Sequence, residues 1–199
     1  NNLFWTRTVN QGDVEKAFKE ADAVVEATLD FARHTGVTLE SRGIVADWNK
    51  AENKMTIYHN GQAPHMMQHI IAKHLGLNEG LVRIVSRDVG GSFGIKVHVY
   101  PDEMAVTAIS KKIGRPVKFI ADRLESFTTD IHARCHKISG KLGVDKNGKI
   151  LAMEIDDLSG IGPFSMYPRT SAIETNQVLN LSGAPYVIPN YKAVGTVVF

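Results

Sequence analysis

The chain has 199 residues, of which 43% are apolar and 22% are charged, and its formal net charge is +2. These values indicate a globular protein with enough apolar residues for one substantial core or two small ones. Charges of both signs are interspersed, so the composition gives no reason to predict a nucleic-acid partner or an acidic membrane surface.

The single cysteine, Cys135, excludes an intramolecular disulfide framework and favours a reducing compartment, so we expect a cytoplasmic protein. No apolar run approaches the ~20 residues that a transmembrane helix needs, so no transmembrane segment is expected. The chain does not begin with methionine and stops within the apolar run 194–199. We therefore expect residues 1–199 to be a fragment of a larger subunit, with no firm internal domain boundary.

The first half of the chain mixes short strands with helices. After a polar arm, Asp13 supplies an N-cap side chain for a helix whose apolar residues recur at helical spacing. The next run alternates apolar and polar residues, which predicts a half-buried strand. A polar turn then predicts a hairpin, and a proline and a glycine mark the ends of the following helix. The expected elements are the helix 13–21, the strand 23–31, the hairpin strands 43–48 and 54–59, and the helix 64–75.

The second half has a β-hairpin as its clearest feature. Asn147-Gly148 lies between two alternating runs, 135–144 and 149–158, and this dipeptide favours a tight turn. The helix 100–114 carries an apolar face that we expect to pack against a sheet, formed by Met104, Ala105, Ala108, Ile109 and Ile113. The other expected elements are the strands 81–85, 116–120 and 193–198, a polar segment from Asp122, a loop at 160–164 and a helix at 170–179. This mixture predicts an α+β fold with hairpins and crossing helices.

Two groups of side chains could bind a metal, but neither has a complete ligand pattern. His65 and His69 share a helix face, yet Met66 stands where the zincin pattern has a glutamate. On an alternating strand, His132 and His136 would lie on the opposite face from Cys135. We therefore predict no metal site formed by these side chains.

A glycine-rich turn, 88–96, follows the expected strand 81–85 and leads into the helix 100–114. Glycines remove the Cβ atoms that keep a ligand off the backbone, so consecutive N–H groups can converge on an acceptor. The turn fits neither familiar nucleotide loop, because Ser92 and Ile95 stand where those motifs need glycine. A turn that only connects two elements is the alternative interpretation.

Gln62 follows the expected strand 54–59 much as the glycine turn follows the strand 81–85. If these strands are neighbours, both ends open on the same edge of the fold, and Gln62 can direct its amide at whatever the turn binds. An amide is a neutral donor, which suits an oxo group or a carbonyl better than proton transfer. A surface glutamine without such a role is the alternative.

The run Gly90-Gly91-Ser92-Phe93-Gly94-Ile95-Lys96 resembles the Gly-Gly-Gly-Phe-Gly-Gly-Lys motif of the molybdenum hydroxylases, the xanthine dehydrogenase and aldehyde oxidase family. The resemblance is to the large, molybdopterin-binding subunit and covers essentially the whole chain in the family's order. Besides Gln62 and the turn, it includes the segments 12–13, 39–40, 114–117, 122–125, 148–150 and 188–191.

The resemblance implies a cofactor-binding role for Gln62, Gly90, Gly91, Ser92, Phe93 and Gly94. Gln62 would hydrogen-bond the apical oxo ligand of molybdenum, the backbone amides of the turn would contact the metal end of molybdopterin, and Phe93 would shape the pocket. The implied reaction is oxidative hydroxylation with water as the oxygen source. The implied cofactor is molybdenum–molybdopterin, with the cytosine dinucleotide form as one option, and FAD and 2Fe-2S clusters would lie on partner subunits or domains of an oligomer.

Departures from the motif bear on the substrate. Ser92 and Ile95 replace glycines, and together with the segment 97–101 they are closer to the carbon monoxide dehydrogenase-like branch. Val97 stands where purine-oxidising members have a glutamate, which argues against xanthine. The resemblance places the substrate loop and the general-base glutamate beyond Phe199, so no catalytic residue is assigned. Two alternatives stay open: an aldehyde or aromatic-heterocycle hydroxylase, and a non-catalytic scaffold that kept the fold.

Overall fold

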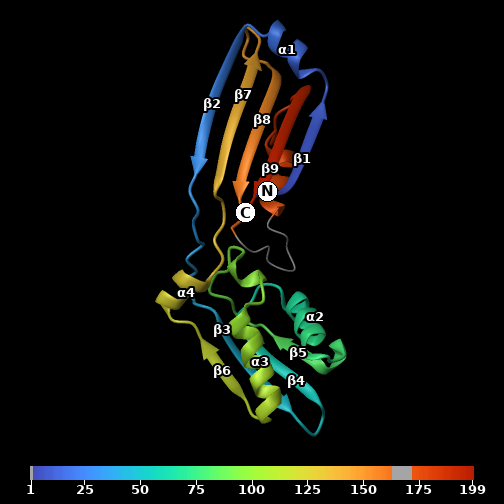
Figure 1. The fold of residues 1–199 in the computed structure, drawn as a ribbon, viewed down its shortest axis with the longest axis vertical. Helices are drawn as coiled ribbons and strands as arrows, with labels where there is room; N and C mark the ends of the chain where they lie inside the picture. Colours follow the sequence, from blue (N-terminus) through green and yellow to red (C-terminus); the bar gives the residue numbers. More distant parts are fainter. Residues whose placement is uncertain (1, 163–171) are drawn as a thin grey trace. The chain divides into compact units, whose positions relative to one another are not determined.

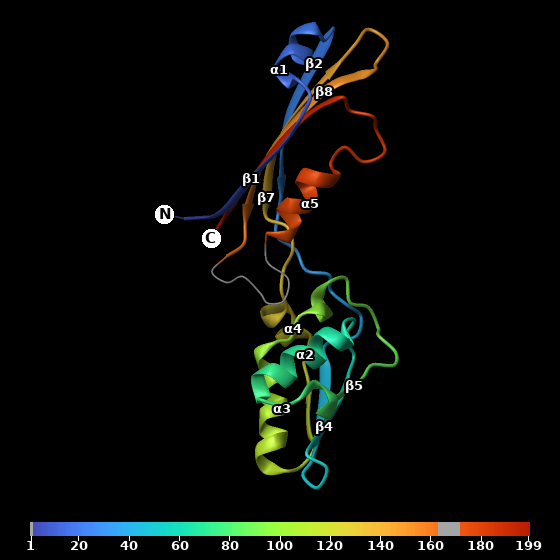
Figure 2. The same cartoon turned by 90° about the vertical axis from the view of Figure 1, so that its right-hand side faces the viewer.

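The computed structural model describes residues 2–162 and 172–199, which form two compact units (Figures 1 and 2). The terminal unit comprises Asn1–His34 and Ala133–Phe199, and the central unit comprises Thr35–His132. Each unit combines a mixed β-sheet with helices, which confirms the predicted α+β fold. Within the described ranges, every helix is too short or too polar to cross a membrane.

The terminal unit is built on a five-stranded sheet (Figure 1). The β8–β9 pair is parallel, and the other neighbouring pairs are antiparallel. The turn before β8 is the predicted one, with Gly148 at a φ of 81°, which favours glycine. The strands across the sheet are β1 (Leu3–Gln11), β9 (Asn190–Val198), β8 (Ile150–Gly160), β7 (His136–Val144) and β2 (Ala23–Phe31).

The helices α1 (Val14–Glu20) and α5 (Ile173–Leu181) pack against this sheet. α1 begins at the predicted N-cap, since a carboxylate oxygen of Asp13 accepts a hydrogen bond from the N–H of Lys16 at 3.0 Å. α5 approaches β9 so closely that a Cβ atom on Gly195 would lie 2.5 Å from Cγ2 of Thr175. A side chain at position 195 would therefore push the helix off the sheet.

The central unit has a four-stranded sheet covered on one side by helices (Figure 2). Its strands are, in order, β5 (Val82–Val85), β4 (Lys54–His59), β3 (Gly43–Asn49) and β6 (Val117–Ile120). Its helices are α2 (Pro64–Leu75), α3 (Pro101–Ile113), α4 (Arg123–Thr129) and the short 3-10 helices η1 (Glu79–Leu81) and η2 (Ile95–Val97). The core between sheet and helices includes Ile44, Ala46, Met55, Ile57, Met67, Ile71 and Val106. The predicted hairpin 43–59 and the helix 64–75 are confirmed.

A buried arginine joins β3 to two helices of the central unit. The side chain of Arg42, 1% exposed, donates to Asp102 Oδ2 at 2.8 Å, Asp130 Oδ1 at 2.6 Å and Glu103 Oε1 at 3.3 Å. His59 Nε2 lies 3.0 Å from the same Glu103 oxygen. Burial alone would lower the pKa of the guanidinium, but its carboxylate partners raise it above the usual value. Arg42 is therefore a permanent cation that neutralises carboxylates inside the unit.

The face of α3 that meets the sheet is partly polar, and the predicted apolar face is wrong. Ile109 and Ile113 are 45% and 54% exposed. Ser110 lies on the buried face, where its hydroxyl accepts from the N–H of Trp48 at 3.1 Å and donates to the carbonyl of Arg115 at 2.9 Å. Specific polar contacts, which an apolar pattern does not record, decide which face is buried. The buried residues of α3 are Glu103, Val106, Thr107 and Ser110.

The expectations for the two outer strands of the terminal sheet also need correction. The arm before Asp13 is not irregular, because Leu3–Gln11 forms β1 and pairs with β9 at the far end of the chain. The strand Ala23–Phe31 has its predicted bounds, yet all of its residues are exposed rather than half-buried. The reason is that α1 and α5 pack on β8 and β9 instead of on β2.

Three later segments are sharpened by the structure. Asp122 starts a polar and mostly exposed segment, as predicted, and this segment is the helix α4, which Asp122 caps in a reciprocal pair with Glu125. Cys135 precedes β7 and has a φ of 75°, so it does not alternate with the strand residues. The predicted helix 170–179 corresponds to α5, which begins at Ile173. Residues 163–171, which include part of the predicted loop 160–164, lie outside the described residues.

We expect Arg42→Met to destabilise the central unit by about 3–5 kcal/mol, because it leaves three buried or half-buried carboxylates without their cation. The measurement is urea unfolding followed by the fluorescence of Trp48, in a background that carries Trp5→Phe. Arg115→Met, at an exposed arginine, is the matched control. Equal stability of the two variants would contradict the role given to Arg42.

Candidate functional site

The candidate site lies where two neighbouring strands of the central sheet end. β4 and β5 are parallel and in register, with Tyr58 opposite Val85, so the chain leaves both strands at the same edge. Gln62 follows β4, and the glycine loop, defined as residues 88–96, follows β5. The N–H of Gln62 donates to the carbonyl of Lys96 at 3.2 Å. The sequence predicted this meeting of Gln62 and the glycine loop.

The glycine loop has a backbone that ordinary residues avoid. Gly91 and Gly94 have φ values of 95° and 94°, in the left-handed region. Gly90 lies so near Glu40 that a Cβ atom at position 90 would come within 2.5 Å of the Cβ atom of Glu40. Phe93 also has a positive φ, 53°, and its side chain is 78% exposed. A large apolar residue held in a costly conformation and turned outward is typical of a binding site.

The side chain of Gln62 is held by the glycine loop. Its Oε1 accepts hydrogen bonds from the hydroxyl of Ser92 and from the N–H of Gly94, the latter at 3.2 Å. Among the described residues, the structure shows no acceptor for the Nε2 group of Gln62. The amide therefore offers its two N–H bonds outward.

Glu40 and Lys96 support the loop from behind. Glu40 Oε2 accepts from the N–H of Gly90 at 2.7 Å and from Lys96 Nζ at 2.8 Å, and the N–H of Glu40 donates to the carbonyl of Gly90 at 3.2 Å. The Lys96 side chain is fully buried. Burial raises the pKa of the Glu40 carboxyl, but the hydrogen bonds from Lys96 and Gly90 together outweigh it and lower this pKa below its usual value. The carboxylate is thus ionised and already neutralised.

The open face of the site presents donors. Within the part of the chain that the structure describes, the N–H groups of Gly91, Ser92 and Phe93 donate to no protein acceptor. Together with the Nε2 group of Gln62, these N–H groups are neutral donors in the glycine loop and at the strand end beside it. Such a set can bind oxo, thiolate or phosphate acceptors but supplies no general base. The predicted site residues Gln62, Gly90, Gly91, Ser92, Phe93 and Gly94 are therefore brought together, and their contacts with a cofactor stay predictions.

The histidines form no metal centre in the described residues, where no group of three or more metal-binding side chains occurs. His69 Nδ1 lies 2.6 Å from Glu79 Oε1 on the surface. His136 is buried in the terminal unit, with Nδ1 2.8 Å from Asp157 Oδ1 and Nε2 3.6 Å from Glu174 Oε2. Arg134 also pairs with Glu174.

Sequence reasoning missed this His136 cluster as well as the supporting role of Glu40. The signal for Glu40 was its place in one of the segments that carry the resemblance, but no role followed from it. The partners of His136 come from two distant elements, β8 and α5, and Arg134 joins the cluster through Glu174, so no spacing in the sequence brings these residues together. These contacts stabilise the fold rather than line the candidate site.

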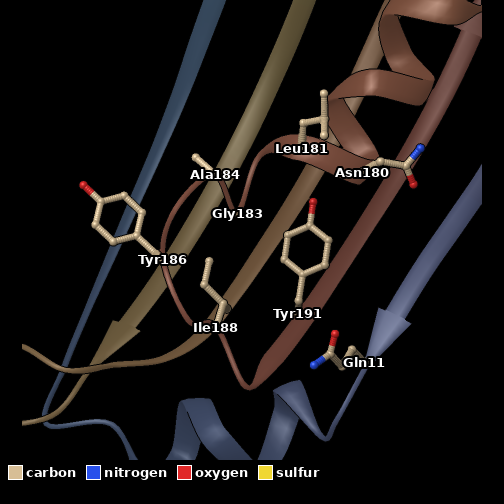
Figure 3. A pocket seen from close by; sticks show the side chains of 8 residues that line it. All are labelled: Gln11, Asn180, Leu181, Gly183, Ala184, Tyr186, Ile188 and Tyr191. Atoms are coloured by element: carbon tan, nitrogen blue, oxygen red, sulfur yellow. The ribbon is translucent and has the colours of Figure 1, made fainter.

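A hollow of about 260 Å³ lies in the terminal unit, between the ends of α5 and β1 and the start of β9 (Figure 3). Tyr186, Tyr191, Asn180 and Gln11 are among its lining residues, and no charged side chain contributes. A larger, open hollow of about 1060 Å³ runs beside α1, where Lys141 pairs with Glu26 and Lys192 pairs with Glu154. Neither hollow contains a nucleophile with a base beside it.

Comparison with known proteins gives consistent matches over the whole chain. The family model of the molybdopterin cofactor-binding domain matches residues 1–199. The nicotine 6-hydroxylase large subunit of Paenarthrobacter nicotinovorans is 32% identical over 163 residues, which cover 82% of this chain and 20% of that protein. The carbon monoxide dehydrogenase large chain of Hydrogenophaga pseudoflava is 32% identical over 164 residues, which also cover 82% of this chain and 20% of that protein. The chain therefore spans about a fifth of these relatives.

Solved structures agree with these relatives. Quinoline 2-oxidoreductase from Pseudomonas putida 86 superimposes with a TM-score of 0.91 at 26% identity, covering 99% of this chain and 25% of that one. Carbon monoxide dehydrogenase from Oligotropha carboxidovorans gives a TM-score of 0.89 at 27% identity, covering 99% and 24%. Both the sequence and the fold of this chain thus recur within much longer chains.

We expect Glu40→Ala to loosen the glycine loop, because it removes the acceptor of the Gly90 N–H and leaves a buried lysine unpaired. Amide hydrogen exchange at the hydrogen-bonded loop amides, those of Gly90, Gly94, Ile95 and Lys96, should become faster by roughly tenfold, which corresponds to ~1.4 kcal/mol of lost protection. Glu52→Ala, which breaks the exposed pair with Lys54, is the control. Unchanged exchange in the loop would show that Glu40 does not support it.

A second prediction concerns pH. The hydrogen bond with Asp157 and the charge of Glu174 raise the pKa of His136 from 6.5 to about 9, and the bond with His136 lowers the pKa of Glu174 from 4.5 to about 2. The stabilisation from His136 is therefore complete below pH 6.5 and is lost as the pH rises through 9. The stabilisation from Glu174 is present above pH 4.5 and is lost as the pH falls through 2.

Thermal unfolding between pH 5 and 10 measures this effect. The difference in Tm between the wild type and His136→Gln should be largest near pH 6 and should shrink between pH 6.5 and 9, because only the wild type loses a buried imidazolium over that interval. His132→Gln, at an exposed histidine, should leave the pH dependence unchanged. A Tm difference that stays constant over this range would contradict the assignment.

Proposed function

This chain belongs to the molybdopterin cofactor-binding domain family, and we propose on that basis that it is part of the large subunit of a molybdenum-dependent oxidoreductase. In this proposal the glycine loop and Gln62 hold the metal end of the cofactor. The observation that carries it is the hold of the glycine loop on Oε1 of Gln62 at one sheet edge, which leaves the Nε2 group of Gln62 and the N–H groups of Gly91, Ser92 and Phe93 without acceptors among the described residues.

The donor set fits the cofactor that the family implies. Molybdopterin presents acceptors at its metal end, oxo oxygens and dithiolene sulfurs, and neutral N–H groups can meet them without the cost of burying a charge. The absence of a Cβ atom lets Gly90 lie against Glu40 and Gly91 lie against the Phe93 ring, and that exposed ring can form an apolar wall. Glu40 would repel an anionic cofactor, but Lys96 neutralises it at 2.8 Å.

The bound cofactor supplies the redox chemistry, and this chain's residues bind and orient it. Gln62 donates through Nε2, the loop amides donate through the backbone, and Phe93 limits the access of water. No group of the site is placed to take up a proton. The base expected from the family resemblance would therefore come from the rest of the subunit, and we infer that the isolated chain does not turn over substrate.

The reaction of the whole protein is proposed as oxidative hydroxylation with water as the oxygen source. We propose that FAD and 2Fe-2S clusters lie on partner subunits. The names of two relatives, a large subunit and a subunit gamma of a dehydrogenase complex, support the presence of such subunits but name no cofactor. Oxidation of carbon monoxide and hydroxylation of an aromatic heterocycle are both represented among the relatives. Val97, which follows Lys96, argues against a purine substrate. The cytosine dinucleotide form of the pterin and the cytoplasmic location stay predictions.

A non-catalytic scaffold is not favoured. A scaffold needs neither a free glutamine amide nor an exposed phenylalanine with a φ of 53° at the sheet edge. Both features carry a conformational cost that ligand binding would justify.

Metal analysis of the full-length subunit, coexpressed with its partner subunits in a host that makes molybdopterin, tests the proposal. The wild type should contain molybdenum and pterin in near-equal amounts with the polypeptide. Gln62→Met keeps the side-chain length but removes the donor, and it should weaken cofactor retention roughly tenfold. Gln177→Met, on the exposed face of α5, should retain the wild-type content. Wild-type protein without metal and without pterin would refute the proposed function.

A further inference from the structure

Ser92 occupies a position where the family motif has glycine, and its hydroxyl makes two hydrogen bonds. The oxygen accepts from the N–H of Lys96 at 3.0 Å, and the hydroxyl donates to Oε1 of Gln62. The carbonyl of Ser92 accepts from the N–H of Ile95 at 2.9 Å. Ser92 thus connects the backbone at the start of η2 to the side chain of Gln62.

The orientation of the Gln62 amide follows from the donors around it. A carboxamide has an end that only accepts, Oε1, and an end that only donates, Nε2. The N–H of Gly94 can only donate, so it requires Oε1 opposite it. The Ser92 hydroxyl is already accepting from Lys96 and has its proton free for the same oxygen. A 180° rotation of the carboxamide would place Nε2 opposite the N–H of Gly94. It would break the two hydrogen bonds that Oε1 accepts, from Ser92 and from Gly94.

We propose that Ser92 is a positioning residue, whose hydroxyl holds Oε1 of Gln62 inside the glycine loop and turns Nε2 outward as a fixed donor. This deepens the proposed function and rests on it for the identity of the acceptor, an oxygen at the metal end of the cofactor. With glycine at position 92, only the N–H of Gly94 would orient the amide. The serine therefore makes this site selective for a ligand that accepts, and poor for one that donates.

The competing role for Ser92 is purely local, a cap that satisfies the N–H of Lys96 and shapes the loop. The two roles differ in their dependence on Gln62. If Ser92 acts through the amide, removal of its hydroxyl has a smaller effect once Gln62 is gone, because only the bond with the N–H of Lys96 is then lost. If it only caps the loop, the effect is the same in both backgrounds.

A double-mutant cycle in the full-length subunit with its partners separates the two roles. The variants are Ser92→Ala, Gln62→Met and the double variant, and Ser92→Thr is the control that keeps the hydroxyl. The measurement is the rate at which molybdenum leaves the purified protein. Ser92→Ala should release the metal roughly fivefold faster than the wild type, and Ser92→Thr should be close to the wild type. The double variant should release it less than about twofold faster than Gln62→Met. An equal effect of Ser92→Ala in both backgrounds would overturn the proposal.

The same variants without cofactor give a second readout. In cofactor-free protein, Ser92→Ala should lower the Tm by about 2 °C in the wild-type background and by about half as much in the Gln62→Met background, where only the bond with the N–H of Lys96 is lost. Wild-type protein that never binds molybdenum or pterin would refute the proposed function, yet this Tm cycle would still decide whether Ser92 orients Gln62. A Tm loss of the same size in both backgrounds would refute the positioning role alone.

Discussion

The buried guanidinium of Arg42 is the contact on which the central unit depends. It lies at the start of β3, pairs with carboxylates of α3 and of the end of α4, and stacks 3.8 Å above the ring of Tyr100. The hydroxyl of Tyr100 donates to the carbonyl of Ile95, inside the glycine loop, and accepts from the N–H of Ile131. A short chain of contacts therefore leads from the ion cluster to the loop, and the loop backbone is fixed from the interior of the fold.

Two carboxylates of the central unit are paired with buried cations, whereas uncharged N–H groups of the glycine loop have no acceptor in the described part of the chain. The carboxylates are held inside or beside cations, Glu103 by Arg42 and Glu40 by Lys96. The N–H groups that the loop leaves without an acceptor among the described residues are neutral donors, and the loop also exposes the Phe93 ring and, at its first residue, the Asp88 carboxylate. The donors need little reorganisation on binding, because Glu40 and Lys96 behind them are already paired. Binding is thereby prepared by contacts that never touch the ligand.

The sequence predicted those features that depend on neighbours along the chain. The hairpin 43–59, α2 with its proline and glycine, the Asn147-Gly148 turn and the pairing of Gln62 with the glycine loop all follow from local signals and from one assumption, that β4 and β5 are neighbours. Features set by distant partners were missed. β1 forms by pairing with β9, at the other end of the chain. The buried face of α3 is set by its contacts with Arg42 and Trp48. The role of Glu40 depends on its hydrogen bond with Gly90. No local pattern encodes such contacts.

The division into two units was hidden from the sequence for a topological reason. The central unit is inserted between β2 and β7, which are neighbours in the terminal sheet, with Phe31 opposite His136. The residues that directly flank the insertion lie side by side, since His34 and Ala133 exchange backbone hydrogen bonds of 3.0 and 2.8 Å. Closing an unfolded loop of roughly a hundred residues would cost the β2–β7 pair about 4 kcal/mol of chain entropy. A folded insert whose ends already lie close together removes most of that cost. The terminal sheet can therefore form this pairing cheaply only after the unit that carries the glycine loop has folded.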